Sequence, residues 1–202
     1  MKLITADASP FGRKCKIVVH ELGLTERVEF ISPGAVTPVS INQDVISVNP
    51  LGMIPILETP DGDSLFDSPV IAEYLNTDAK GDLFPADFQN RFRSLKLQAL
   101  ADGIMDISVA IRYETALRPE PLRWKEWIEH QGLAVDRGLA TLNQLCPTFS
   151  GRQTIGEIAV ACALGYRDFR FPGTPWREHN PALAEWFEEV GQKPAMQATV
   201  PA

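Results

Sequence analysis

The chain has 202 residues, of which 45% are hydrophobic and 22% are charged, an ordinary globular composition that excludes collagen-like and low-complexity material. This length is enough for one large domain or two small ones, each with its own core. The 26 acidic and 19 basic side chains give a net charge of −7, which argues against a general nucleic-acid binder.

Sequence features that report on compartment favour a soluble protein of the reducing cytoplasm. The first seven residues end on a charge, Asp7, before the apolar core of a signal peptide can form. The longest apolar stretch, residues 158–166, is about half as long as a membrane-spanning helix. Cys15, Cys146 and Cys162 are odd in number and far apart, which argues against a disulfide framework or a metal cluster.

Up to about residue 75, short apolar runs alternate with turn residues and short amphipathic stretches. The elements expected there are strands at 2–6 and 28–31, a helix at 13–22, a hairpin at 56–59 and 64–66, and a helix at 69–75. Gly23 closes the first of these helices. This order predicts a small mixed sheet covered by helices.

The pattern changes after a polar, turn-rich segment at residues 76–82. Residues 1–78 hold 5 basic and 11 acidic side chains, a charge of −6, whereas residues 79–202 hold 14 and 15, a charge of −1. Beyond the segment, apolar residues recur at helical spacing, and helices are expected from near 87, at 121–145, at 155–169, and from Pro181 after Asn180 as cap. We predict an α/β domain at 1–78, a linker at 79–86 and an all-helical domain at 87–202.

Ser9-Pro10-Phe11-Gly12 stands where the first strand gives way to the first helix. A helix N-terminus offers unpaired N–H groups and the positive end of a dipole, which suit an anion such as a thiolate. Glutaredoxin-like proteins carry Cys-Pro-Tyr/Phe-Cys here, so this segment resembles a thioredoxin-like domain without its redox pair. Ser9 acting only as the helix cap, with Pro10 at the first position, is the alternative interpretation.

Asn49-Pro50-Leu51-Gly52-Met53-Ile54-Pro55 leads into the third strand with two bends and a proline at its start. If the Ile54–Pro55 bond is cis, the N–H and C=O of Ile54 turn outward unpaired. A peptide ligand can then pair with them as an added strand. An ordinary trans proline at a strand start is the alternative.

Asp67-Ser68-Pro69 precedes the helix that follows the hairpin. Pro69 fits the first helical position and Ser68 the cap, so a plain helix start is one interpretation. The other is a ligand site, in which the Ser68 hydroxyl and N–H bind a carboxylate at the helix N-terminus. An ionised Asp67 suits a ligand ammonium.

These motifs, in this order and followed by a polar linker and a helical domain, resemble the soluble glutathione transferase family. The resemblance continues at Thr154-Ile155-Gly156-Glu157, which has the form of the capping box that begins a buried helix in this family, with Glu157 where aspartate is commoner. It covers essentially the whole chain and is closest to small bacterial members with serine at the first helix. It implies a thioredoxin-like α/β N-terminal domain, ordered βαβ-α-ββα, followed by an all-α helical bundle.

The resemblance also implies a role for each matching residue. The Ser9 hydroxyl, beside Phe11 in the glutathione site, would donate to the glutathione sulfur and stabilise its thiolate. The cysteinyl backbone of glutathione would lie against Ile54–Pro55, with that bond cis. The γ-glutamyl carboxylate would bind Ser68 and its ammonium Asp67. Glutathione is thus the expected co-substrate, and no metal is expected.

Residues of the helical half carry further expectations. Asp102 resembles a position from which some family members reach the glutathione ammonium across a dimer interface; a solvated or helix-pairing acid is the alternative. Tyr113, on the same helix face, either lines the electrophile pocket or packs in the core. Cys15 is expected to be a small core residue rather than a redox thiol. The three histidines lack partners at metal spacing and are expected to be exposed.

The function that the resemblance implies is a cytoplasmic, homodimeric glutathione transferase. It would conjugate glutathione to a small hydrophobic electrophile, or reduce one with it, as in detoxification. A non-catalytic protein that binds glutathione or hydrophobic ligands is one alternative, because the fold serves both uses. A glutathione-dependent peroxidase or disulfide reductase is another. A maleylacetoacetate-type isomerase is disfavoured, because such relatives carry Ser-Ser-Cys where this chain has Ala8-Ser9-Pro10.

Overall fold

The structure, a computed structural model, describes residues 1–149 and 153–201. The chain forms two compact units: the sheet unit, made of Met1–Arg91 with Pro194–Ala202, and the helical unit, made of Phe92–Lys193. The C-terminal segment therefore belongs with the N-terminal unit, which its position in the sequence does not indicate. The domain bounds given above, with a linker at 79–86, stay a prediction.

The sheet unit is built on four short strands: β1 (Lys2–Ile4), β2 (Glu29–Ile31), β3 (Ile56–Glu58) and β4 (Ser64–Leu65). Their order is β2-β1-β3-β4, with β1 and β2 parallel and the other two pairs antiparallel. Ile4 pairs with Ile56, and Leu65 pairs with Leu57. Because of this register, the chain leaves β1, enters β3 and leaves β4 at the same end of the sheet. We name it the motif end, since the three motifs lie there.

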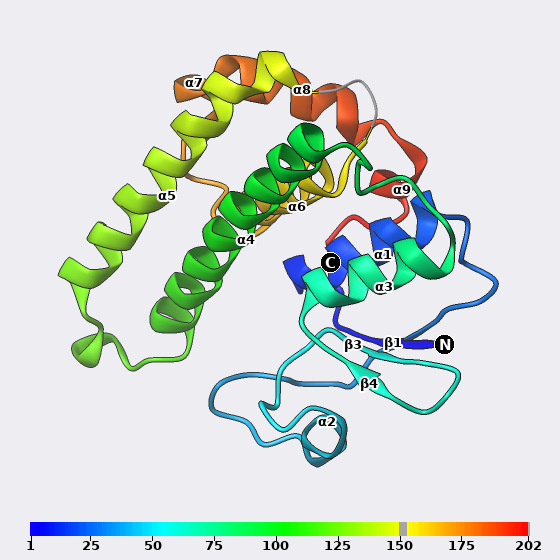
Figure 1. The fold of residues 1–202 in the computed structure, drawn as a ribbon. Coiled ribbons are helices and arrows are strands. Elements are labelled where there is room, and N and C mark those ends of the chain that lie inside the picture. The colour runs from blue at the N-terminus through cyan, green and yellow to red at the C-terminus, as the bar shows by residue number, and fades with distance from the viewer. Residues whose placement is uncertain (150–152, 202) are drawn as a thin grey trace. The chain divides into compact units, whose positions relative to one another are not determined.

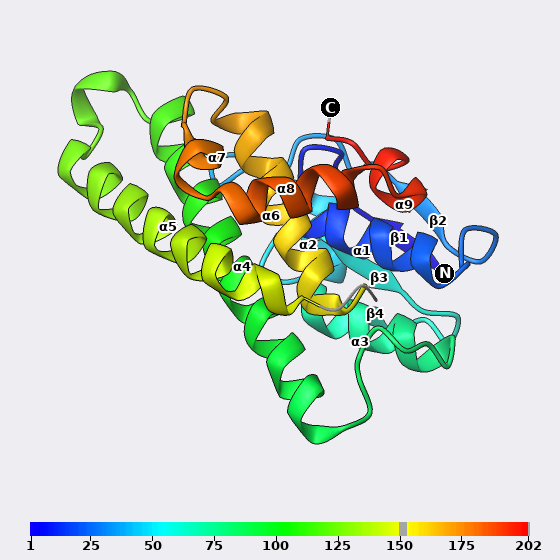
Figure 2. The same ribbon diagram turned by 90° about the horizontal axis from the view of Figure 1, so that it is seen from above.

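The helices of the sheet unit, within the described residues, are α1 (Pro10–Glu21), α2 (Gln43–Val48), α3 (Ser68–Asp78) and α9 (Pro194–Gln197). In Figure 1, α1 and α3 lie side by side on one face of the sheet, and α2 lies on the other side. The short helix α9 contacts α1, as Figure 2 shows. Fully buried apolar side chains from both strands and helices form the core, among them Leu3, Ile17, Leu57, Ile71 and Leu75.

Helix α1 spans Pro10–Glu21, so it begins before the start expected at residue 13. Ser9 is its N-cap, and the Ser9 side chain accepts a hydrogen bond from the Gly12 N–H at 3.1 Å. Pro10 lies in the first turn, where no partner for a backbone N–H is needed. Gly23 follows the helix with a φ of 65°, a conformation that glycine adopts without steric cost.

The helical unit contains α4 (Phe88–Ala116), which begins in the sheet unit, followed by α5 (Lys125–Leu145), α6 (Ile155–Arg170), α7 (Trp176–His179) and α8 (Pro181–Gly191). Two 3-10 turns, η1 (Glu120–Leu122) and η2 (Cys146–Thr148), flank α5. Figure 2 shows α4 and α5 as the two long arms of a helical hairpin. None of the described helices combines the length and the apolar composition needed to cross a bilayer.

Helix α6 is the core helix of this unit, because all of its residues from Ile155 to Arg167 are buried. Its predicted capping box is confirmed: the Thr154 side chain accepts the Glu157 N–H, and the Glu157 carboxylate accepts the Thr154 N–H at 2.9 Å. The Gly156 N–H donates to Ser94 Oγ of α4 at 3.1 Å. With this unit in place, the predicted fold class, a thioredoxin-like α/β domain followed by a helical one, is confirmed.

Predictions at three further helix N-termini need correction. The first is in the sheet unit, where Asp67, not Ser68, is the N-cap of α3. Asp67 has extended backbone angles and its carboxylate accepts the Ser68 N–H, whereas Ser68 is already helical. A carboxylate at this position also interacts favourably with the positive end of the helix dipole.

The other two corrections concern the helical unit. Helix α5 begins at Lys125 rather than near residue 121, because residues 120–122 form the separate turn η1. Helix α8 begins at Pro181 as expected, but the Asn180 side chain does not cap it. Instead, Asn180 Nδ2 donates to the Trp176 carbonyl at 2.8 Å, and Asn143 Oδ1 of α5 accepts the Leu183 N–H at 3.0 Å.

Candidate active site

The motif end of the sheet brings together two helix N-termini. Helix α1 starts after β1 and α3 starts after β4, and the chain leaves both strands at this end. A helix N-terminus carries partial positive charge and N–H groups that the helix backbone itself leaves unpaired. The Cys15 Sγ of α1 lies 3.9 Å from the carbonyl oxygen of Ser68, the first residue of α3, so the two helices are in contact close to these ends. The arrangement suits an anionic ligand.

Ser9 combines a structural role with an unused hydrogen-bond donor. Its side chain is half-buried, and its oxygen accepts the Gly12 N–H. Among the described residues, the hydroxyl proton of Ser9 has no acceptor. Because a hydroxyl has one donor and two acceptor positions, capping the helix leaves the proton available to a ligand. The cap and the ligand interpretations of Ser9 are therefore compatible.

Gly12 allows the first turn of α1 to approach the loop after β1. A Cβ at Gly12 would lie 1.7 Å from Thr5 Oγ1 and 2.9 Å from Thr5 Cβ. Thr5 is only 2% exposed, so its side chain has little room to move away. The sequence analysis identified Gly12 only as a position where glutaredoxin-like proteins carry a cysteine. The sequence around Gly12 does not indicate that its backbone packs against Thr5. Gly12 is thus a residue that the site requires for close packing.

Ile54 presents an unpaired backbone at the motif end. The Ile54–Pro55 peptide bond is cis, as the resemblance implies. Among the described residues, neither the N–H nor the C=O of Ile54 has a hydrogen-bond partner. Asn49 holds the loop before it, since its Nδ2 donates to the Met53 carbonyl at 2.9 Å and its Oδ1 accepts the Leu51 N–H at 3.1 Å. The backbone of Ile54 is therefore free to pair with an extended ligand.

Asp67 and Ser68 occupy the start of α3, with their polar groups partly engaged. Asp67 is exposed, and its carboxylate accepts the Ser68 N–H. Ser68 is fully buried, and its hydroxyl has no hydrogen-bond partner within the described chain. The Ser68 N–H and hydroxyl are the two donors expected to bind a ligand carboxylate. The N–H is already bonded to Asp67, and the hydroxyl is buried. A carboxylate reaches them only after a local rearrangement.

Basic side chains of α1 provide positive charge in an otherwise acidic unit. Arg13 Nη2 donates to the Met196 carbonyl at 3.2 Å, which anchors the C-terminal segment to α1. Lys14 is fully buried, with its ammonium 5.9 Å from the centre of the Phe11 ring. Lys16 is paired with Asp7. Arg13 and Lys14 thus face the protein interior, and long-range attraction of an anion is opposed by the net charge of residues 1–78.

Two predicted site residues, Asp102 and Tyr113, lie on α4 in the helical unit, and both are half-buried. Their roles toward glutathione and the electrophile stay predictions. The expectation of three exposed histidines is corrected for His20, which is half-buried with its ring centre 6.1 Å from that of Phe30. His130 and His179 are exposed. In the part of the chain that is described, no three His, Cys, Asp or Glu side chains meet as a metal site requires.

The cysteines behave as core residues. Cys15, Cys146 and Cys162 are free thiols, and all three are buried. Burial, together with the charges of Glu185 and Glu157, raises the pKa of Cys146 to about 11. A thiol with such a pKa is a poor nucleophile near neutral pH, because little thiolate is present. The structure thus gives Cys146 a packing role rather than a catalytic one.

Comparison with known proteins identifies both halves of the chain. Residues 8–78 match the family model "Glutathione S-transferase, N-terminal domain", and residues 125–189 match "Glutathione S-transferase, C-terminal domain". An uncharacterised GST-like protein of Escherichia coli K12, YibF, is 33% identical over all of this chain and 98% of its own length.

Solved structures with bound glutathione are also similar. A glutathione transferase family member from Pseudomonas fluorescens Pf-5 is 42% identical, with a TM-score of 0.96 over 100% of this chain and 98% of that one. A glutathione S-transferase from Methylobacillus flagellatus KT is 33% identical, with a TM-score of 0.90 over 100% and 99%.

Proposed function

This chain belongs to the glutathione S-transferase family, and we propose that it binds glutathione at the motif end and activates its thiol there for transfer to an electrophile. The observation that carries the proposal is the Ser9 hydroxyl, which caps α1 with its oxygen and keeps its proton free for a ligand sulfur. Two similar proteins, at 42% and 33% identity, were solved with glutathione bound, which supports the choice of ligand.

The hydrogen bond from Ser9 and the dipole of α1 are together strong enough to lower the pKa of the glutathione thiol. A free thiol has a pKa of about 8.5 and is only a few per cent ionised near neutral pH. Lowering this pKa by about 2 units requires about 2.7 kcal/mol of preferential thiolate stabilisation. One hydrogen bond from the Ser9 hydroxyl to the thiolate contributes about 1.5–3 kcal/mol, and the N-terminus of α1 adds about 0.3–1 kcal/mol. Together these are sufficient without a general base.

The rest of glutathione is proposed to extend from α1 toward β3 and α3. Its cysteinyl N–H and C=O would pair with the unpaired backbone of Ile54, beside the cis Pro55 and the ring of Phe11. The γ-glutamyl ammonium would bind the exposed Asp67 carboxylate. When it does, Asp67 can release the Ser68 N–H to the γ-glutamyl carboxylate. The ammonium of the ligand thus provides the positive charge that replaces the Ser68 N–H as the partner of the Asp67 carboxylate.

The helical unit is proposed to complete the enzyme. Tyr113 would line the electrophile pocket, and Asp102 of the partner subunit in a homodimer would reach the glutathione ammonium. The absence of a thiol at residues 9 and 12 supports transfer over disulfide exchange. We also propose a cytoplasmic location and a role in detoxification, on the basis of family membership.

Variants of Ser9 separate helix capping from thiol activation. Aspartate caps a helix as well as serine does but cannot donate a hydrogen bond when ionised, whereas alanine does neither. We expect Ser9→Asp to keep the thermal stability of the parent and, like Ser9→Ala, to lose at least about tenfold in kcat for conjugation. Glutathione affinity, measured by calorimetry, should change little in Ser9→Ala.

Binding without turnover decides between the transferase and the alternatives. A chlorinated aromatic, an isothiocyanate, a peroxide and a mixed disulfide would be tested with the unaltered protein. Turnover of the first two supports the transferase. If glutathione binds and none of the four reacts, the protein is a non-catalytic binder, and if only the last two react, it is a peroxidase or reductase.

A further inference from the structure

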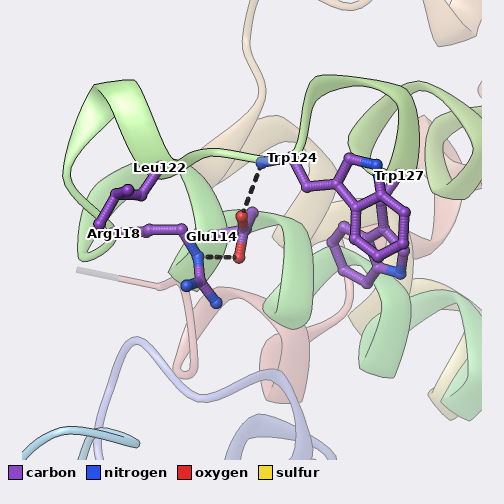
Figure 3. A pocket seen from close by; sticks show the side chains of 5 residues that line it. All are labelled: Glu114, Arg118, Leu122, Trp124 and Trp127. Carbon is purple, nitrogen blue, oxygen red and sulfur yellow. Dashed lines mark hydrogen bonds and ion pairs between the residues drawn. The ribbon is translucent and has the colours of Figure 1, made fainter.

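The turn between α4 and α5 contains a pocket that thiol activation does not use. Its lining comes from the end of α4, the connection that contains η1 and the start of α5: Glu114, Arg118, Leu122, Trp124 and Trp127. Figure 3 shows Arg118 and Leu122 on one side of Glu114 and the two tryptophans on the other. The pocket has a volume of about 350 Å³, which is within the range of small-molecule sites.

Glu114 holds the pocket together. One carboxylate oxygen accepts the Trp124 N–H at 3.0 Å, and the other accepts Arg118 Nε at 2.7 Å. These hydrogen bonds lower the pKa of Glu114, so the carboxylate stays ionised near neutral pH. Both oxygens are occupied, and the Glu114 side chain is only 12% exposed. Glu114 therefore positions Arg118 and the start of α5, and little of its charge faces the cavity.

Arg118 has unused donors at the pocket. Its side chain is 52% exposed, and only its Nε is engaged within the described residues. The two terminal nitrogens remain available for a planar anion, which can bind them in a bidentate manner. Arg123 adds a second cation nearby, since its Nε donates to the Arg118 carbonyl at 3.1 Å. Arg118 is therefore the cationic group in the lining, with Glu114 as its ion-pair partner.

The rest of the lining is apolar, and much of it faces solvent. Trp124 is 62% exposed and Leu122 is 67% exposed, although both are large apolar residues. Trp127 is half-buried beside Trp124. Exposed apolar side chains gathered around a cavity mark a binding surface more often than scattered ones do. Indole rings bind the faces of other aromatic rings well.

We infer that this pocket binds a small planar aromatic carboxylate or sulfonate, with its ring against Trp124 and Trp127 and its anionic group on the terminal nitrogens of Arg118. The guanidinium and the indole rings select for both properties in one molecule. The site lies within the helical unit and requires no glutathione. The proposed binding is reversible, and its lining includes none of the residues assigned to thiol activation.

The test uses the full-length protein, with naphthalene-2-sulfonate as the anionic probe and 2-naphthol as its neutral counterpart. The chain has four tryptophans, so the indole N–H signals in a two-dimensional ¹⁵N NMR spectrum report on the site directly. We expect the sulfonate to shift the Trp124 and Trp127 signals more than those of Trp176 and Trp186. The neutral probe should bind at least about tenfold more weakly, which corresponds to about 1.4 kcal/mol.

Variants and competition complete the experiment. Arg118→Met should weaken sulfonate binding at least about tenfold, whereas Arg137→Met, which removes an exposed arginine elsewhere on α5, should not change it. Saturating glutathione should leave the titration unchanged. Equal affinity for the two probes, unchanged signals of Trp124 and Trp127, or displacement of the sulfonate by glutathione would each overturn the inference. None of these results bears on whether Ser9 activates a thiol.

Discussion

The close packing at Gly12 makes the most demanding stability prediction. Gly12→Ala places a Cβ 1.7 Å from Thr5 Oγ1, so α1 or the loop after β1 must move. Overpacking of this kind costs about 1–3 kcal/mol, and displacement of the Gly12 N–H from Ser9 Oγ adds the loss of a cap, about 1 kcal/mol. Alanine has a better helix propensity than glycine, which offsets about 1 kcal/mol of this destabilisation. We therefore expect a net loss of about 1–3 kcal/mol, or about 2–12 °C in Tm.

A rescue variant and a control make this prediction specific. Thr5→Ala removes the oxygen in closest contact, and that oxygen has no hydrogen-bond partner in the described chain. The double variant should recover at least about 1 kcal/mol relative to the sum of the two single changes. Gly132→Ala, in α5 with nothing within 4 Å of the added Cβ, should instead stabilise by about 0.5–1 kcal/mol. Unchanged Tm in Gly12→Ala, or strict additivity in the double variant, would refute the reasoning.

Further predictions concern the helical unit and the start of α3. Gly156→Ala should destabilise by about 2 kcal/mol or more in denaturant titration, because its Cβ would lie 2.4 Å from the Ser94 carbonyl oxygen, a backbone atom. Cys146 should resist a thiol reagent at pH 8, since its pKa of about 11 leaves about one thiol in a thousand ionised; rapid labelling in the folded protein would contradict this. Ser68→Ala should raise the glutathione KM with little change in kcat, and an unchanged KM would exclude the Ser68 hydroxyl from the carboxylate site.

Local boundary signals made much of the sheet unit predictable. Ser9 before Pro10 and a glycine after the helix gave the ends of α1, because caps act over one turn of chain. The same reasoning was one residue off at α3, where two adjacent residues, Asp67 and Ser68, are both good caps. Only the backbone angles distinguish them.

Contacts between distant segments were not predictable in this way. Arg13 donates hydrogen bonds to the Thr199 hydroxyl and the Met196 carbonyl, which lie about 180 residues later in the sequence. The close approach of Thr5 to Gly12 likewise depends on how α1 packs against the sheet. Single-sequence patterns describe one element at a time, so they carry no information about which elements pack together.

The pocket at the α4–α5 turn shows the same limit. Trp124 lacks a capping side chain, and the residue that accepts its N–H is Glu114, ten positions earlier on another helix. From the spacing of apolar residues alone, the helix is expected to begin near residue 121. The contribution of Glu114 became visible only with the packing of the two helices.

The ultraviolet difference spectrum on adding glutathione tests the central claim most directly. In the unaltered protein, a thiolate absorption band should appear near neutral pH and titrate about 2 units below the free thiol, at about pH 6.5. In Ser9→Ala, the band should be absent at neutral pH while glutathione still binds. A band of equal size and pKa in both proteins, or bound glutathione without a band in the unaltered protein, would contradict activation by Ser9.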